Sequence, residues 1–182
     1  MVDVYVSAGS NIEPERNLAR ALELLNAQYA PLRVSPAYRN RAVGFEGEDF
    51  INLVVGFTTS DPIARVREQL QAIEAQCGRP ADAPKWAART MDLDILLYGD
   101  LVRASPGYVL PRPDLVKRAY MLKPLADIAP DLVHPVSRKT MRELWEAFDK
   151  DAHELVRVKG EGLGAWGLGR GVGLGVWGLG QK

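Results

Sequence analysis

The order of extended and helical segments limits the folds open to this chain more than any other feature. Segments rich in β-branched, aromatic and other apolar residues predict four strands, at residues 2–8, 32–38, 50–59 and 91–98. Two stretches, one after the first strand and one after the third, instead repeat apolar residues at helical spacing. The resulting order, strand–helix–strand–strand–helix–strand, predicts an α+β fold of the ferredoxin-like kind, an antiparallel sheet with both helices on one face.

The two predicted helices have recognisable starts, and one has a clear end. Proline suits the first helical turn, so we expect one helix to begin at Pro14 and the other at Asp61 and Pro62. Gly78 is the expected end of the second helix. The apolar stripes are Leu18, Ala21, Leu22 and Leu25, and then Ile63, Val66, Leu70, Ile73 and Cys77. Beyond the core we expect a strand near 101–103, a proline-rich turn at 111–113, and C-terminal helical additions near 121–128 and 138–148.

Composition agrees with one compact domain. The chain has 182 residues, of which 47% are hydrophobic, which is enough for a single sizeable core. Lys plus Arg and Asp plus Glu number 23 each, and this balance argues against a general binder of nucleic acids or membrane surfaces. Cys77 is the only cysteine, which favours a reducing, cytoplasmic setting. We also expect neither a signal peptide nor a membrane-spanning segment.

A change of composition at Gly160 marks the expected domain boundary. Ten of the 17 glycines lie between there and Lys182, where GLGAWGLGR is repeated 11 residues later as GLGVWGLGQ. Glycine at this density raises the entropic cost of any regular structure. We therefore expect a globular domain over residues 1–159 and a flexible glycine-rich tail over residues 160–182, to which we assign no function.

Asp92 and Asp94 lie one residue apart in the last predicted strand, although aspartate is a poor strand former. Residues i and i+2 share a strand face, with Cα atoms roughly 6.5–7 Å apart, so both carboxylates face the same way. The apolar row expected on the opposite face is Met91, Leu93, Ile95 and Leu97. From this alternation alone, the pair is either part of a solvated sheet face or a site for a hard cation. Mg²⁺ takes only one or two carboxylates and completes its shell with water and phosphates.

Six cationic residues flank the acidic pair, and they favour a site for a magnesium–nucleotide complex. Arginine binds phosphate oxygens with two parallel donors, and a loop tryptophan such as Trp86 can cover a ligand. Two long polar connections, at 39–49 and 78–90, have the character of binding loops. The sequence has no Walker motif and no zinc-ligand spacing. The flanking cations are Arg79, Lys85, Arg89, Arg112, Lys117 and Arg118.

Residues 85–96, KWAARTMDLDIL, resemble the K-x-A-A-R-x-x-D-L-D-I-L signature of the 6-hydroxymethyl-7,8-dihydropterin pyrophosphokinase (HPPK) family. The resemblance extends over about residues 2–150 and includes GSN at 9–11, VGFEGEDFIN at 43–52 and RAYMLKPLADIAP at 118–130. It implies a ferredoxin-like fold and Mg²⁺-dependent transfer of diphosphate from ATP to the hydroxymethyl group of the dihydropterin, with release of AMP. It also implies a cytoplasmic, monomeric enzyme with these two small-molecule substrates and no nucleic acid or membrane partner.

The resemblance also implies roles for individual residues. Asp92 and Asp94 match the aspartates that hold two Mg²⁺ ions on the ATP phosphates, and with Arg79 and Arg89 they form the expected catalytic set. The expected ATP-binding residues are Gln71, Glu74, Lys85, Trp86, Ile95, Arg112 and Arg118. The expected pterin-binding residues are the backbone of Ala42, Val43 and Gly44, the aromatic pair Phe50 and Tyr120, and the amide of Asn52.

Four residues at three places depart from the family pattern. Arg112 stands where the family commonly has histidine, which removes a group that titrates near neutrality. Ala81 stands where some members carry arginine, and Asn40 with Arg41 replaces a Thr-Pro type lead into the pterin loop. Two alternatives stay open, a catalytically weakened homologue and a non-enzymatic ferredoxin-like module that binds RNA or a small ligand. RNA binding would need exposed aromatic side chains and basic charge on a sheet face.

Overall fold

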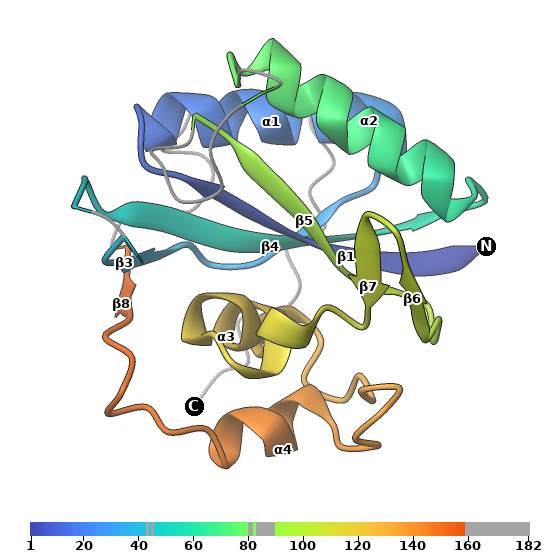
Figure 1. Cartoon of the computed structure of the whole chain (residues 1–182), viewed down its shortest axis with the longest axis vertical. Coiled ribbons are helices and arrows are strands. Elements are labelled where there is room, and N and C mark those ends of the chain that lie inside the picture. The colour runs from blue at the N-terminus through green and yellow to red at the C-terminus, as the bar shows by residue number, and fades with distance from the viewer. Residues whose placement is uncertain (43, 45, 80–81, 83–89, 159–182) are drawn as a thin grey trace.

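One antiparallel sheet lies between two layers of helices in the computed structural model, which describes residues 1–42, 44, 46–79, 82 and 90–158 (Figure 1). Helices α1 (Pro14–Tyr29) and α2 (Ile63–Gln76) cover the upper face of the sheet. Helices α3 (Ala119–Ile128) and α4 (Met141–Glu146) lie below it. Among the described residues, no helix combines the length and apolar character needed to cross a membrane.

The strands pair in the order expected of a ferredoxin-like fold. The main sheet has the order β5-β1-β4-β3-β8, with β2 also paired to β4, and all of its pairings are antiparallel. A separate hairpin of β6 and β7 leads to the short 3₁₀ helix η1 (Pro113–Val116). The strands are β1 Val2–Ser10, β2 Arg33–Val34, β3 Tyr38–Asn40, β4 Phe50–Thr59, β5 Asp92–Tyr98, β6 Arg103–Ser105, β7 Tyr108–Leu110 and β8 Val156–Arg157.

Both faces of the sheet carry an apolar core. The upper core packs the predicted stripes of α1 and α2, without Ile63, against alternate residues of β1 and β4, among them Val6 and Leu53. The lower core packs α3, α4 and η1 against the other face, including Val54 and Leu96. The predicted α+β architecture is therefore confirmed, and the C-terminal helical additions form the second layer.

One predicted feature of β5 is wrong. Met91, Leu93 and Ile95 do pack into the upper core, but Leu97 lies in the lower core. The cause is a bulge, because Tyr5 pairs with Leu97 while Val6 pairs with Ile95, which leaves Leu96 as an extra residue. A bulge shifts the alternation of side chains by one position. The expected apolar row is therefore broken at its end, whereas the two aspartates before the bulge keep their common face.

Other boundaries differ in ways that local sequence does not reveal. The predicted strand at 32–38 is divided into β2 and β3. The strand expected at 101–103 is displaced into the β6–β7 hairpin, which turns at Gly107 with φ +91°. Helix α2 begins at Ile63, and the carboxylate of Asp61 accepts a hydrogen bond from Tyr29 instead of capping that helix (3.3 Å). The predicted end at Gly78 is confirmed by its φ of +86°.

Candidate active site at the start of strand β5

Asp92 and Asp94 point from the start of β5 toward the side of the sheet that α3 covers. Asp94 pairs with Ser7 of β1, which in turn pairs with Val54 of β4, a residue of the lower core. Directly paired residues of neighbouring strands share a face, so both carboxylates lie on the α3 side. The side chain of Asp92 is 37% exposed and that of Asp94 is 24% exposed, so the pair is accessible from solvent without lying on an open surface.

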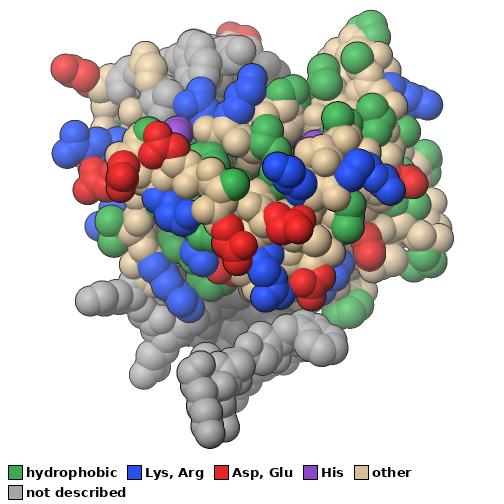
Figure 2. All heavy atoms as spheres, turned by 90° about the horizontal axis from the view of Figure 1, so that it is seen from below, with side chains coloured by type: hydrophobic (Ala, Val, Ile, Leu, Met, Phe, Trp, Pro, Cys, Tyr) green, Lys and Arg blue, Asp and Glu red, His purple; other side chains and the backbone are tan. Residues whose placement is uncertain are grey.

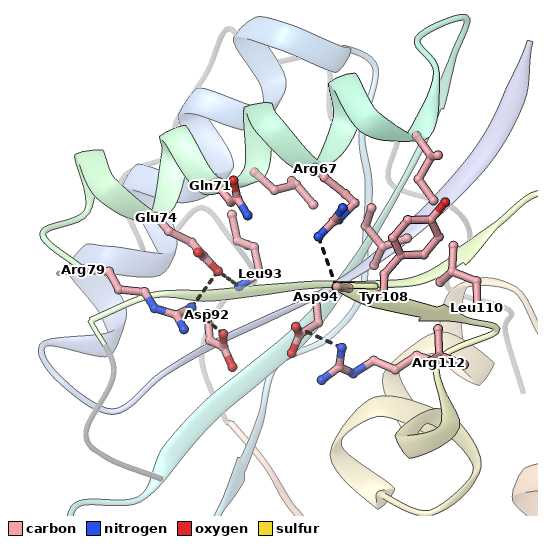
Figure 3. A pocket seen from close by; sticks show the side chains of 15 residues that line it. Arg67, Gln71, Glu74, Arg79, Asp92, Leu93, Asp94, Tyr108, Leu110 and Arg112 are labelled. Carbon is pink, nitrogen blue, oxygen red and sulfur yellow. Dashed lines mark hydrogen bonds and ion pairs between the residues drawn. The ribbon is translucent and has the colours of Figure 1, made fainter. Parts of the chain in front are cut away.

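Arg79 connects the first of these aspartates to helix α2 (Figure 3). Its Nη1 donates to Asp92 Oδ1 at 2.7 Å and to Glu74 Oε1 at 2.8 Å. The same Glu74 oxygen accepts from the backbone N–H of Leu93 at 2.8 Å, since β5 is an edge strand with donors facing outward. Glu74 thus closes the sheet edge and holds Arg79 beside the acidic pair.

Arg112 forms an ion pair with the second aspartate, Asp94. Its Nη1 lies 3.2 Å from Asp94 Oδ1, and its Nη2 lies 3.7 Å from an oxygen of Asp114. The backbone N–H of Arg112 donates to the carbonyl of Leu96 at the bulge (2.9 Å), which anchors the chain entering η1 to β5. Its Nε is buried and has no partner among the described residues.

Two carboxyl groups of the site, those of Asp94 and Glu74, have raised pKa values and are harder to ionise than free carboxyls. Burial raises the pKa of Asp94 to about 6, and the charge of Asp92 adds to this effect more than Arg112 offsets it. Burial likewise raises the pKa of Glu74 to about 7, although the Leu93 N–H and Arg79 both favour its ionised form. A divalent cation at the aspartates would lower both values, because it stabilises the negative charge.

The donor set suits magnesium better than a metal that needs a complete protein cage. Within the described ranges, no three or more His, Cys, Asp or Glu side chains come together as a metal-binding group. Asp92 and Asp94 therefore supply two carboxylates, and further ligands would come from water or a substrate. That combination is the ordinary coordination of Mg²⁺ in sites that bind nucleotide phosphates.

A pocket extends from the acidic pair along α2 to the β6–β7 hairpin (Figure 3). Seven predicted residues line it, and the structure brings them together: Gln71, Glu74, Arg79, Asp92, Asp94, Ile95 and Arg112. The far end was not predicted. There Arg67 lies over the ring of Tyr108 at 4.8 Å and donates to the carbonyl of Gly107 at 3.1 Å. The Ser-Pro-Gly sequence at 105–107 is a turn signal that could have indicated this hairpin.

The amide expected to bind the pterin lies in one row with the acidic pair. Asn52 on β4 pairs with Gly9 on β1, and Gly9 pairs on its other side with Asp92 on β5. Gly9 has no side chain, and a Cβ there would lie 2.3 Å from Asn52 Oδ1. The space between Asn52 and Asp92 therefore depends on glycine, a site residue that the sequence reasoning did not single out. The Asn52 Nδ2 donates to Asn40 Oδ1 at 2.5 Å, which fixes the buried amide.

The remaining predicted residues lie in several different parts of the fold. Phe50 shares the face of Asn52 at the start of β4, and Tyr120 on α3 packs against the lower core on that face. Burial is the main cause of the raised pKa of Tyr120, and the charges of Asp94 and Asp92 add to it. Arg118 precedes α3, outside the described lining of the pocket, and Ala42 and Gly44 lie in the connection between β3 and β4. Val43, Ala81, Lys85, Trp86 and Arg89 lie outside the described residues.

The edge strand β5 presents two carboxylates, and each of them lies beside an arginine. This arrangement is typical of enzymes that bind a metal cation together with a phosphate chain. The family model described as 7,8-dihydro-6-hydroxymethylpterin-pyrophosphokinase (HPPK) matches residues 5–130, and the chain belongs to this family. It is 33% identical over 145 residues to the 2-amino-4-hydroxy-6-hydroxymethyldihydropteridine pyrophosphokinase of Aquifex aeolicus, covering 79% of this chain and 90% of that protein. It is also 40% identical over 147 residues to the Synechocystis protein of the same name, an alignment that covers 79% of this chain and 75% of that protein.

Solved structures agree on the fold. The wild-type HPPK-DHPS of Plasmodium falciparum superposes with a TM-score of 0.60 at 14% sequence identity over 80% of this chain. This chain spans 44% of the Plasmodium chain. At that level of identity the likeness concerns the arrangement of helices and strands alone.

Proposed function

We propose that the pocket at β5 binds ATP with magnesium and that the row from Asp92 to Asn52 aligns it with a dihydropterin. As a member of the HPPK family, the chain is a transferase that moves diphosphate from ATP to the hydroxymethyl group of 6-hydroxymethyl-7,8-dihydropterin, giving AMP and the pterin diphosphate. The observation that carries the site assignment is the row Asn52–Gly9–Asp92 across three paired strands.

On the nucleotide side, Asp92 and Asp94 would hold two Mg²⁺ ions, which when bound neutralise phosphate charge and orient the transferring group. Arg79 and Arg112 flank the aspartates and are the described donors for phosphate oxygens. Gln71 and Ile95 also line the pocket and would contact the nucleoside. Lys85, Trp86 and Arg89 complete this part of the proposal on the family resemblance, with Arg118 at the N-terminus of α3.

On the pterin side, a flat ring would bind over Gly9 between Phe50 and Tyr120, with its polar edge on Asn52. Asn52 lies two strand spacings, about 9–10 Å, from Asp92 with Gly9 between them, so the ring would span the distance from the amide to the acidic pair. Its hydroxymethyl group can then point at the phosphates without movement of the sheet. The backbone of Ala42, Val43 and Gly44 is proposed to bind the same ring, as the family resemblance implies.

A module that binds RNA on an open sheet is disfavoured by the architecture. Modules of that kind stack bases on an exposed sheet face. Here α1 and α2 cover one face and α3 covers the other (Figure 1). On the outer surface below the sheet, Asp and Glu side chains are interspersed with Lys and Arg (Figure 2).

The decisive assay mixes the protein with ATP, Mg²⁺ and 6-hydroxymethyl-7,8-dihydropterin and measures AMP. We expect AMP to form only when all three are present. Asp92→Asn and Asp94→Asn should each lower turnover roughly a thousandfold or more, because each removes a metal ligand. Matched circular dichroism spectra would show that the fold survives. Substantial turnover in either variant would contradict the metal assignment, and no AMP from the wild type would favour a catalytically weakened homologue.

The proposal includes the state and extent of the working enzyme. We propose a cytoplasmic monomer whose catalytic domain is residues 1–159, with the glycine-rich segment 160–182 outside it. The single cysteine supports a reducing compartment, and the change of composition at Gly160 supports the domain boundary. Size-exclusion chromatography with light scattering tests the oligomeric state.

A further inference from the structure

Arg112 is paired with the carboxylate that the proposed function assigns to a cation. Its Nη1 is 3.2 Å from Asp94 Oδ1, so one positive group already occupies this oxygen in the free protein. A divalent ion that approaches Asp94 meets both a competitor for the oxygen and a like charge beside it. An ATP molecule that brings the same ion also brings phosphate oxygens, which are acceptors for a guanidinium.

We propose that Arg112 is a resident counter-ion of the metal site, which gives up Asp94 to the cation and turns to a phosphate oxygen when the metal–nucleotide complex binds. The inference deepens the proposed function and rests on it, since the cation and the phosphate chain are the ligands of that function. Its consequence is selectivity: the site disfavours a bare divalent ion and favours one that arrives with a nucleotide.

The contacts of Arg112 allow this exchange. The backbone N–H is fixed to the Leu96 carbonyl at 2.9 Å, so the guanidinium can move while its Cα stays in place. The second contact, to Asp114, is long at 3.7 Å. The buried Nε has no partner among the described residues, and a buried donor of this kind is stabilised by any acceptor that reaches it. The side chain is also 34% exposed, which leaves it room to rotate.

Of the two arginines beside the aspartates, Arg79 is the one that stays in place when a cation binds. It donates to two carboxylate oxygens, on Glu74 and Asp92, at 2.8 and 2.7 Å. When Asp92 engages a cation, Glu74 still holds Arg79 beside the phosphates. Within the part of the chain that the structure describes, Arg112 has no comparable second partner at short distance, so it is the arginine whose release accompanies metal binding.

The test is the binding of Mn²⁺, used as a probe for Mg²⁺, to the free protein by isothermal titration calorimetry. Without nucleotide, Arg112→Gln should bind Mn²⁺ roughly three- to tenfold more tightly than the wild type. In the steady-state assay the same variant should show a KM for the magnesium–ATP complex about tenfold higher, because a phosphate donor is lost. These two changes have opposite signs, which a purely structural role would not produce.

Two variants serve as controls. Arg112→Lys keeps the positive charge and should bind Mn²⁺ about as weakly as the wild type. Arg65→Gln removes one positive charge from the exposed side of α2, where Arg65 pairs with Glu68 at 2.8 Å, and should leave both measurements unchanged. Thermal unfolding of each variant confirms that it is folded.

Equal or weaker Mn²⁺ binding by Arg112→Gln would overturn the proposal. Failure of both the wild type and Arg112→Gln to bind Mn²⁺ would also overturn the proposal. If the wild type then still makes AMP, the proposed function stands without the counter-ion role. If Arg112→Gln binds Mn²⁺ more tightly while the wild type makes no AMP, the counter-ion role stands and the proposed reaction falls.

Discussion

Gly9 defines the space between the two substrates by having no side chain. It lies between Asn52 and Asp92 in the paired strands, and any Cβ would meet Asn52 Oδ1 at 2.3 Å. That contact is far below van der Waals separation, so the amide would have to move. Because Asn40 holds the Asn52 amide, the movement would also disturb the connection between β3 and β4.

Gly9→Ala is therefore expected to raise the KM for the dihydropterin about tenfold or more while changing the KM for ATP little. Steady-state kinetics with each substrate varied in turn would show this difference. Gly56→Ala is a matched control in the same sheet, where the new Cβ meets the Tyr5 ring at 2.9 Å, away from the site. It should lower stability without changing either KM, and an equal rise of both KM values for Gly9→Ala would contradict the assignment.

The raised pKa of Asp94 makes the free protein less stable as pH rises. Burial and Asp92 lift this pKa from 3.8 to about 6, so the folded state binds the proton more tightly than the unfolded state. The associated stability is fully present below about pH 4 and is lost as pH rises through 6. The largest expected loss is about 3 kcal/mol, from a shift of roughly two units.

Asp94→Asn stays neutral and should lack this loss. Urea unfolding in EDTA at about pH 4 and pH 7.5 would then show the variant gaining stability relative to the wild type at the higher pH. Other groups with raised pKa values, such as Glu74, are present in both proteins and largely cancel in the difference. A constant difference between the two pH values would contradict the prediction.

Strands and helices with a strong period could be predicted, and short or shifted elements could not. The alternation of β1 and β4 and the stripes of α1 and α2 follow directly from buried faces, as does the common face of Asp92 and Asp94. The extra residue at Leu96 reversed the expected position of Leu97 without any local signal. Strand β8 has only two residues, too few for a period. The contact of Arg112 with Asp94 depends on how η1 packs beside β5, which no local pattern encodes.

Arg67 joins helix α2 to the β6–β7 hairpin through its side chain. Arg67 donates to the Gly107 carbonyl at 3.1 Å and lies over the Tyr108 ring. Arg67→Ala should loosen the hairpin and raise the KM for ATP several-fold, since the hairpin forms the outer wall of the pocket. Faster hydrogen exchange at residues 103–110 would accompany it. Arg65→Ala, two residues earlier on α2, is the control, and unchanged exchange in the Arg67 variant would contradict the proposed contact.

The boundary at residue 159 can be tested by truncation. A protein ending at residue 159 is expected to keep full AMP-forming activity and an unchanged melting temperature. A second truncation after residue 154 removes β8, which pairs with β3 through Tyr38 and Arg39, and also removes Val158, whose N–H donates to the Ala37 carbonyl at 2.9 Å. That variant should melt several degrees lower because an edge of the sheet loses its partner. Loss of activity in the first truncation would place part of the site in segment 160–182.

Because Asn52, Gly9 and Asp92 are joined by backbone pairing, their spacing does not depend on the packing of any side chain. Substitutions in either core can change stability while the separation of the two substrates stays constant. Inserting one residue into β1 before Gly9 would instead reverse which face each later residue occupies. Evolution of this enzyme can thus change either core without moving this row, whereas insertions and deletions within β1, β4 and β5 near the row should be excluded.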